Sequence, residues 1–197
     1  MEHRDVAAVA VFTALILGSD FVLYPLANVK LLDTVVFVAA FVFGPKVGAA
    51  VAVLSETSWG FVSPAGNAGA ILPFLVAGEL LFVLAGYVAL KLGTPGSVTV
   101  VSPRNLFFGG LLAICAFCWD FETNLATGLL GGAHTIPSLL AYEVPGIPFM
   151  ILHEASDFMF GALVAPPVIV YARRTLARNG DAVATATGRL TPVARGG

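Results

Sequence analysis

Long apolar runs separated by short polar stretches make up most of the chain, and this pattern predicts helices that cross a lipid bilayer. A spanning helix needs about 20 apolar residues. Six runs are candidates, although the second and third are short: residues 6–24, 32–43, 47–61, 70–90, 106–130 and 147–171. We therefore predict six transmembrane helices.

The second and third runs are separated by the sequence FGPK at residues 43–46. Gly44 permits a tight turn, and Pro45 disfavours a helical conformation at the residue before it. The sequence therefore predicts a hairpin of two tilted or partly buried helices in this region, and not one continuous span.

The composition supports a membrane location. Hydrophobic residues make up 58% of the chain and charged residues 11%, whereas soluble domains average about 45–50% and about 25%. We expect an all-α integral membrane protein, with a six-helix membrane domain at residues 1–176 and a disordered cytoplasmic tail at 177–197.

The net charge of −2 gives no indication of nucleic-acid binding. Cys115 and Cys118 lack the second half of a metal site and are interpreted as packing residues.

The distribution of basic residues predicts the orientation. With six spans, both termini lie on the same side of the membrane. The loops on that side carry nearly all the basic residues, namely Arg4, Lys46, Lys91, Arg104, Arg173, Arg174 and Arg178, whereas the other side carries Lys30. Cytoplasmic loops are the ones rich in Lys and Arg. We therefore expect a multi-pass protein of the cell membrane with both termini in the cytoplasm.

Acidic residues within the apolar runs are the first indication of a functional site. With this orientation they fall near the middle of the bilayer or in its outer half: Asp20, Asp33, Glu56, Glu79, Asp120, Glu122, Glu154 and Asp157. A charged side chain at the bilayer centre costs about 2.5–3.5 kcal/mol on the translocon scale. These groups must face an enclosed interior, share protons or become neutral, and Lys30 is the one basic partner at that depth. The alternative for any one of them is a hydrogen bond between packed helices.

The spacing of polar residues in the fifth run separates two faces of the predicted helix. Asp120 and Asn124 are four residues apart and share a face that suits a cavity. Glu122 lies about 200° away from Asp120 at about 100° per residue, so we expect it to meet a neighbouring helix. In the sixth run, His153 and Asp157 are one helical turn apart.

Three short patterns resemble the substrate-binding S components of energy-coupling factor (ECF) transporters, over residues 6–172. The first is the small-residue series Ala10, Ala14 and Gly18. The second is the stretch NVKLLDTVVFVAAFVFGPKVGAAVAVLSE at residues 28–56. The third is WDFETN at residues 119–124, which is similar to a D-x-x-T-N pattern in that family.

The resemblance implies a binding subunit that captures a vitamin-like molecule from outside and delivers it inward. Its partners would be a transmembrane coupling protein and two ATPase subunits. No G-x-x-x-x-G-K-[ST] phosphate loop is present, so we expect ATP to be used by those partners and no cofactor or metal in this chain. The small residues Ala10, Ala14 and Gly18 would face the partner, because small-xxx-small spacing lets helices approach closely. Packing within the chain is the alternative.

By position, the resemblance implies a substrate pocket in the outer half formed by Asn67, Glu79, Asp120, Asn124, Tyr142, His153 and Asp157. Carboxylates outnumber basic residues there, which departs from pockets for anionic vitamins. We therefore expect a ligand with a cationic or amine-rich group.

Other classes of function are compatible with the same residues. Aligned intramembrane acids are typical of an autonomous cation- or proton-coupled transporter. The sequence HEASD at residues 153–157 begins like the H-E-x-x-H motif of zinc enzymes, but Asp157 replaces the second histidine. An intramembrane metal-dependent hydrolase is therefore the weaker alternative, and we do not expect an enzyme. A scaffold subunit is the remaining alternative.

Overall fold

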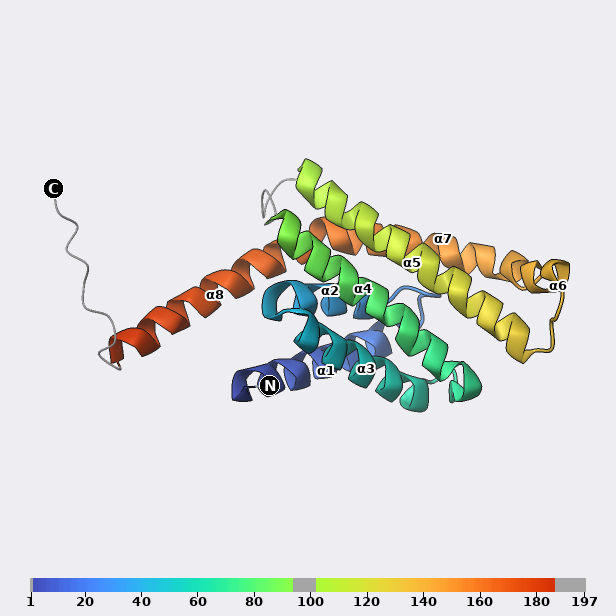
Figure 1. Cartoon of the computed structure of the whole chain (residues 1–197), viewed down its shortest axis with the longest axis horizontal. Helices are drawn as coiled ribbons and strands as arrows, with labels where there is room; N and C mark the ends of the chain where they lie inside the picture. Colours follow the sequence, from blue (N-terminus) through green and yellow to red (C-terminus); the bar gives the residue numbers. More distant parts are fainter. Residues whose placement is uncertain (1, 94–101, 187–197) are drawn as a thin grey trace.

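The computed structural model describes residues 2–93 and 102–186 and contains no strand within them. The α-helices, labelled in Figure 1, are α1 (His3–Leu23), α2 (Leu32–Phe43), α3 (Pro45–Val62), α4 (Leu72–Leu92), α5 (Pro103–Leu130), α6 (Ile136–Leu140), α7 (Glu143–Leu163) and α8 (Ala165–Ala186). A short 3-10 helix, η1 (Gly69–Ile71), precedes α4. The prediction of an all-α protein is confirmed.

Within the residues that the structure describes, four segments are long and apolar enough to cross a membrane: His3–Leu23, Gly69–Leu92, Pro103–Leu130 and Glu143–Arg178. The arrangement is compatible with a membrane bundle.

Helix α2 lies at the centre of this bundle. Every residue from 32 to 41 is buried, and the helix packs against α1, α3, α4, α5, α7 and α8. Its 12 residues span about 18 Å, which is less than the roughly 30 Å of a bilayer's hydrocarbon core. Because of this burial, helix α2 is enclosed by protein over most of its length.

The predicted break between the second and third helices is present. Gly44 has a φ of 92° and ends α2, and Pro45 is the first residue of α3. The two helices then pack side by side as a hairpin. Their approach is close at Gly48, where an added Cβ atom would lie 2.6 Å from the Cβ of Ala40.

The prediction of one continuous sixth helix at residues 147–171 is wrong. Helix α7 begins earlier, at Glu143, and the chain breaks at Val164 before α8 begins at Ala165. Pro166 and Pro167 follow the junction and have no backbone N–H to donate to the carbonyls of α7. Helix α8 continues to Ala186, into the tail that was expected to be disordered from residue 177, and residues 187–197 lie outside the described part.

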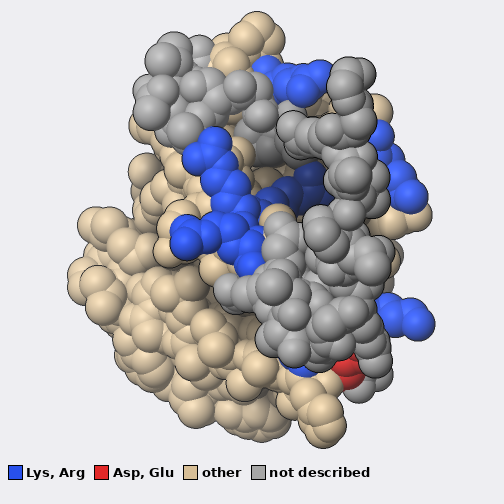
Figure 2. Space-filling view, turned by 90° about the vertical axis from the view of Figure 1, so that its left-hand side faces the viewer, with Lys and Arg blue, Asp and Glu red and all other residues tan. Residues whose placement is uncertain are grey.

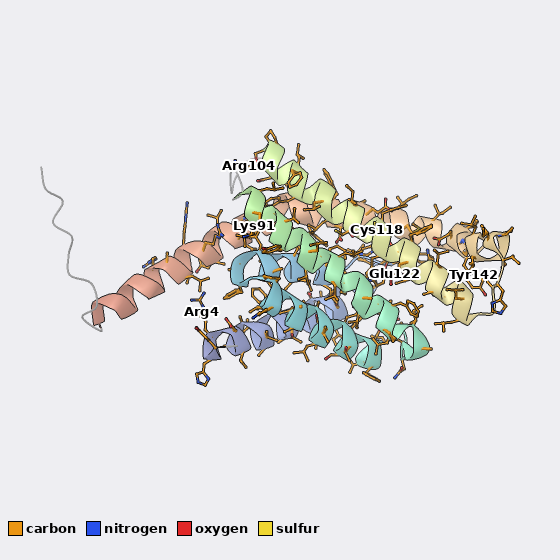
Figure 3. All side chains as sticks on the ribbon, in the orientation of Figure 1. Arg4, Lys91, Arg104, Cys118, Glu122 and Tyr142 are labelled. Carbon is orange, nitrogen blue, oxygen red and sulfur yellow. The ribbon has the colours of Figure 1, made fainter. Side chains whose placement is uncertain are left out.

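Basic side chains gather at one end of the bundle. Arg4, Lys91 and Arg104 lie at this end, and Tyr142 lies at the opposite end (Figure 3). Figure 2 views the basic end face, on which Lys and Arg are far more prominent than Asp and Glu. Arg173 belongs to the same end, because its guanidinium lies 5.0 Å from the ring of Phe41 near the end of α2.

Candidate binding site at a buried polar centre

Six polar side chains from four helices and one loop meet inside the bundle, toward the end opposite the basic face. We call them the polar centre: Lys30, Asp33, Glu79, Asp120, His153 and Asp157. Lys30 comes from the loop at residues 24–31, and the others from α2, α4, α5 and α7. The side chains of the helix residues are fully or almost fully buried. Two further buried acids, Asp20 on α1 and Glu56 on α3, interact electrostatically with Lys30 or Asp33.

His153 is the hub of the polar centre. Its Nδ1 atom lies 2.9 Å from Oδ2 of Asp120, and its Nε2 atom lies 3.1 Å from Oδ2 of Asp33. Nε2 is also 3.9 Å from Oδ2 of Asp157, one helical turn away on α7. The ring of Trp119 packs edge-on against the imidazole. These contacts fix the orientation of the ring between helices α2 and α5.

Lys30 supplies a positive charge to the polar centre. Its Nζ atom lies 3.8 Å from the centre of the Trp119 ring and 4.0 Å from Oδ1 of Asp33. Burial lowers the pKa of Lys30, but the acids around it, with Asp33 and Glu56 foremost, raise that pKa above its ordinary value. Lys30 is therefore charged, and the cation–π contact with Trp119 adds to its stabilisation.

Asn28 attaches the same loop to two helices. Its backbone has a φ of 55°, a left-handed conformation that asparagine adopts more readily than most residues. Its Nδ2 group donates to Oδ1 of Asp120 and to the carbonyl oxygen of Phe149, each at 3.2 Å. The loop at residues 24–31 is thus held to α5 and α7 directly beside the polar centre.

Asn28 lines two open cavities. The larger has a volume of about 490 Å³ and is lined by Asp20, Tyr24, Pro25, Leu26, Ala27, Asn28, Val29, Lys30, Trp59, Ser63 and Ala65. The smaller has a volume of about 320 Å³ and is lined by Asn28, Trp119, Asp120, Thr123, Asn124, Gly146 and Phe149. Asp120 therefore faces a cavity and also contacts His153, so it connects the outer surface of the centre to its interior.

Several carboxylate oxygens in the centre have no hydrogen-bond partner. Both oxygens of Asp157 and both oxygens of Glu79 are buried and have no hydrogen-bond partner, and Oδ1 of Asp33 has only the ammonium group of Lys30, at 4.0 Å. The carboxyl groups of Glu79 and Asp33 lie side by side, where they can bond only by sharing a proton. Buried polar groups in folded proteins are almost always paired, so the centre has the properties of a site that accepts a cation.

The structure brings together four of the seven residues that the family resemblance implied for the pocket: Glu79, Asp120, His153 and Asp157. Asn124 lies at the rim, where it lines the smaller cavity and donates to Oε2 of Glu143 at 3.1 Å.

The remaining two residues of the implied pocket lie outside the centre. Asn67 is exposed and accepts a hydrogen bond from the backbone of Gly69 within its own loop. Tyr142 packs over Gly128 and Gly131 at the end of α5.

Four residues of the site were absent from the implied pocket: Asn28, Lys30, Asp33 and Trp119. Asp33 and Lys30 had been recognised as a buried acid and its one basic partner, but nothing in the sequence connected them to His153. Glu122, which was expected on another face of the same helix, is half-buried and lies near Cys118 (Figure 3).

The small residues Ala10, Ala14 and Gly18 are all exposed on α1. An apolar groove of about 680 Å³ adjoins them and is lined by Ala14, Leu15, Gly18, Ser19, Val22, Leu23, Leu31, Phe160 and Val164. This face of α1 is therefore not used for packing within the described chain.

Comparison with known proteins gives no match: no family model, no curated protein and no solved structure is similar to the chain.

Proposed function

We propose that this protein is the substrate-binding membrane subunit of an ECF-type uptake transporter. It captures a small molecule with a cationic or amine-bearing group from outside the cell. It then delivers that molecule inward together with a transmembrane coupling protein and two ATPase subunits.

The polar centre is the observation that carries this proposal. Three helices that are separate in sequence, α2, α5 and α7, bring carboxyl groups to one histidine. A charged group inside a membrane protein is expensive and is typically retained for binding or transport. The excess of carboxyl groups over basic groups in the described part of the centre favours a positively charged ligand.

The two ends of the bundle support an orientation with both termini in the cytoplasm. The basic face in Figure 2 has the composition of a cytoplasmic surface. The polar centre and its two cavities lie toward the other end, and a ligand would therefore enter from outside. Six crossings require that the short hairpin of α2 and α3 contributes two of them, with α1, α4, α5 and the α7–α8 segment contributing the rest.

The exposed small residues of α1 support the assignment of a partner-facing surface. In lipid, helices associate mainly through close packing, which small residues permit. Ala14 lies on this face and also lines the apolar groove, so it is the most informative position for a test of docking.

Co-purification tests the proposal directly. The protein is co-expressed with the coupling protein and ATPase pair from the same genome, and the wild type is expected to purify with all three. Ala14→Leu is expected to reduce recovery of the partners at least tenfold, because the larger side chain holds the helices apart. The control is Ala155→Leu, which changes an exposed alanine on α7 and should leave recovery unchanged. Failure of the wild type to recover any partner would contradict the proposal.

An autonomous cation- or proton-coupled transporter is the second candidate, and the row of buried acids from Asp20 to Asp157 favours it. Such a protein would transport without ATPase partners. Uptake that persists without them and stops on addition of a protonophore would establish this candidate in place of the first.

A further inference from the structure

We propose that Asp33, His153 and Asp157 form a binding site for a divalent transition-metal ion of the zinc class. The proposal deepens the proposed function, because it adds to the polar centre a metal ion that a ligand arriving from the adjoining cavity can coordinate. The site itself depends only on the geometry of these three residues.

The donor atoms are already close enough to share an ion. One ligand atom from each residue lies within 4.8 Å of the other two, and all three residues are buried. Nε2 of His153 is 3.1 Å from Oδ2 of Asp33 and 3.9 Å from Oδ2 of Asp157. A tetrahedral zinc ion with bonds of about 2.0–2.1 Å separates its ligand atoms by about 3.3 Å. Small side-chain movements would therefore complete the coordination.

Asp120 prepares the histidine for this role. Its Oδ2 atom contacts Nδ1 of His153 at 2.9 Å, so in the metal-bound form Asp120 would accept a hydrogen bond from Nδ1–H and leave Nε2 free to bind the ion. A carboxylate on the far nitrogen of a histidine is the usual outer-shell partner at zinc sites, where it fixes the tautomer and raises ligand basicity. Asn28 holds the other oxygen of Asp120, which keeps this carboxylate in position.

Asp157 provides an independent indication of a missing ligand. It is completely buried, and neither of its carboxylate oxygens has a hydrogen-bond partner. Lys30 does not fill this role, because it approaches Asp33 and does so from the side of Oδ1. Oδ2 of Asp33 and Oδ2 of Asp157 therefore both lie near Nε2 of His153 without a contact to Lys30.

The mixture of ligands selects the class of metal. Imidazole suits zinc, cobalt and related ions, whereas calcium and magnesium prefer sites composed of oxygen ligands. One histidine and two carboxylates occupy three positions, and a fourth remains for water or for a ligand arriving from the cavity beside Asp120. We expect Zn²⁺ and Co²⁺ to bind, and Mg²⁺ and Ca²⁺ to bind at least 100-fold more weakly.

The test uses the purified full-length protein in detergent, without partners. Metal is removed with a chelator, Zn²⁺ is titrated by calorimetry, and bound zinc is counted by elemental analysis. The wild type should bind one ion per chain. Loss of a direct ligand should cost more than the 10- to 100-fold expected for loss of an outer-shell partner. His153→Gln and Asp157→Asn should therefore lower affinity more than 100-fold, and Asp120→Asn by 10- to 100-fold. The control is His134→Gln, which removes an exposed histidine and should change nothing.

A spectroscopic measurement distinguishes loss of metal binding from loss of folding. Co²⁺ bound to the wild type should give the intense visible absorption of a tetrahedral site, and Asp157→Asn should lose it while retaining the wild-type elution volume and helical circular dichroism. Absence of stoichiometric zinc in the wild type would overturn the proposal, as would unchanged affinity in both ligand variants. If zinc binds but the ECF partners are not recovered, the metal site stands and the transport assignment fails. If the ECF partners are recovered but the wild type binds no zinc, the transport assignment stands and the metal site fails.

Discussion

Lys30 and the acids around it depend on one another for their charge. The lysine is largely buried, and its ammonium group contacts Trp119 and faces Asp33. Removing one partner of a buried ion pair leaves an uncompensated charge, which is more costly than replacing both partners together. The charge balance of the whole centre is therefore sensitive to this single side chain.

We expect Lys30→Met to lower the free energy of unfolding by about 3–5 kcal/mol, the usual cost of breaking a buried pair. The measurement is thermal or denaturant unfolding in detergent. Lys91→Met is the matched control, because Lys91 also lies near an aromatic ring, Tyr87, but is exposed at the basic end. Equal stability of the two variants would mean that the acids near Lys30 hold protons and need no counter-charge.

The sequence predicted part of this centre and could not predict the rest. The spacing of His153 and Asp157 placed them on one face of a helix, and Asp120 was recognisable as an acid in an apolar run. The contact between His153 and Asp33 joins residues 120 positions apart and follows only from the packing of α7 against α2. Asn67 and Tyr142 were inferred by position from a resemblance, and no physical pattern in the sequence tied them to the centre.

Helices α5 and α7 make the most extensive helix–helix contact in the described part of the chain, and glycines allow their backbones to approach closely. An added Cβ atom at Gly109 would lie 2.5 Å from the carbonyl oxygen of Phe158, and one at Gly161 would lie 2.9 Å from the Cα of Gly109. The same pair of helices carries Asp120 and His153. The spacing of the backbones therefore determines whether these side chains meet.

We expect Gly109→Ala to destabilise the protein by about 1–3 kcal/mol, the typical cost of overpacking. The adjacent Gly110 has open space at its Cβ position, so Gly110→Ala should be neutral or stabilising, because alanine favours the helix by about 1 kcal/mol. Unfolding of the two variants in the same detergent gives the comparison. A similar loss of stability in both variants would show that α5 and α7 are not in close contact near Gly109.

Helix boundaries were predictable where a local signal marked them. Gly44 and Pro45 interrupt an apolar run, and the chain does turn there. The break between α7 and α8 was missed, although Pro166 and Pro167 lie next to it, because the apolar run continues through the prolines and hydropathy does not distinguish a straight helix from a broken one. The short helix α6 lies in a segment without a long apolar run and left no such signal.

The charge distribution of the whole molecule gives a prediction about its orientation. In a cysteine-free background, Asn67→Cys should react with a membrane-impermeant maleimide on intact cells, because residue 67 is exposed at the end that we assign to the outside. Lys46→Cys should react only after the membrane is permeabilised, because cytoplasmic loops carry the basic residues. The opposite labelling pattern would reverse the orientation and place the polar centre on the cytoplasmic side.

The enclosure of α2 has a consequence for how the protein is made. Helix α2 is synthesised before α4, α5, α7 and α8, which later surround it, so the ribosome delivers Asp33 well before His153. At about 5–20 residues per second, the 120 residues between them take roughly 6–24 seconds to translate. Lys30 lies three positions before Asp33, so the two residues enter the translocon together. Lys30 can therefore neutralise the Asp33 carboxylate until His153 has been synthesised.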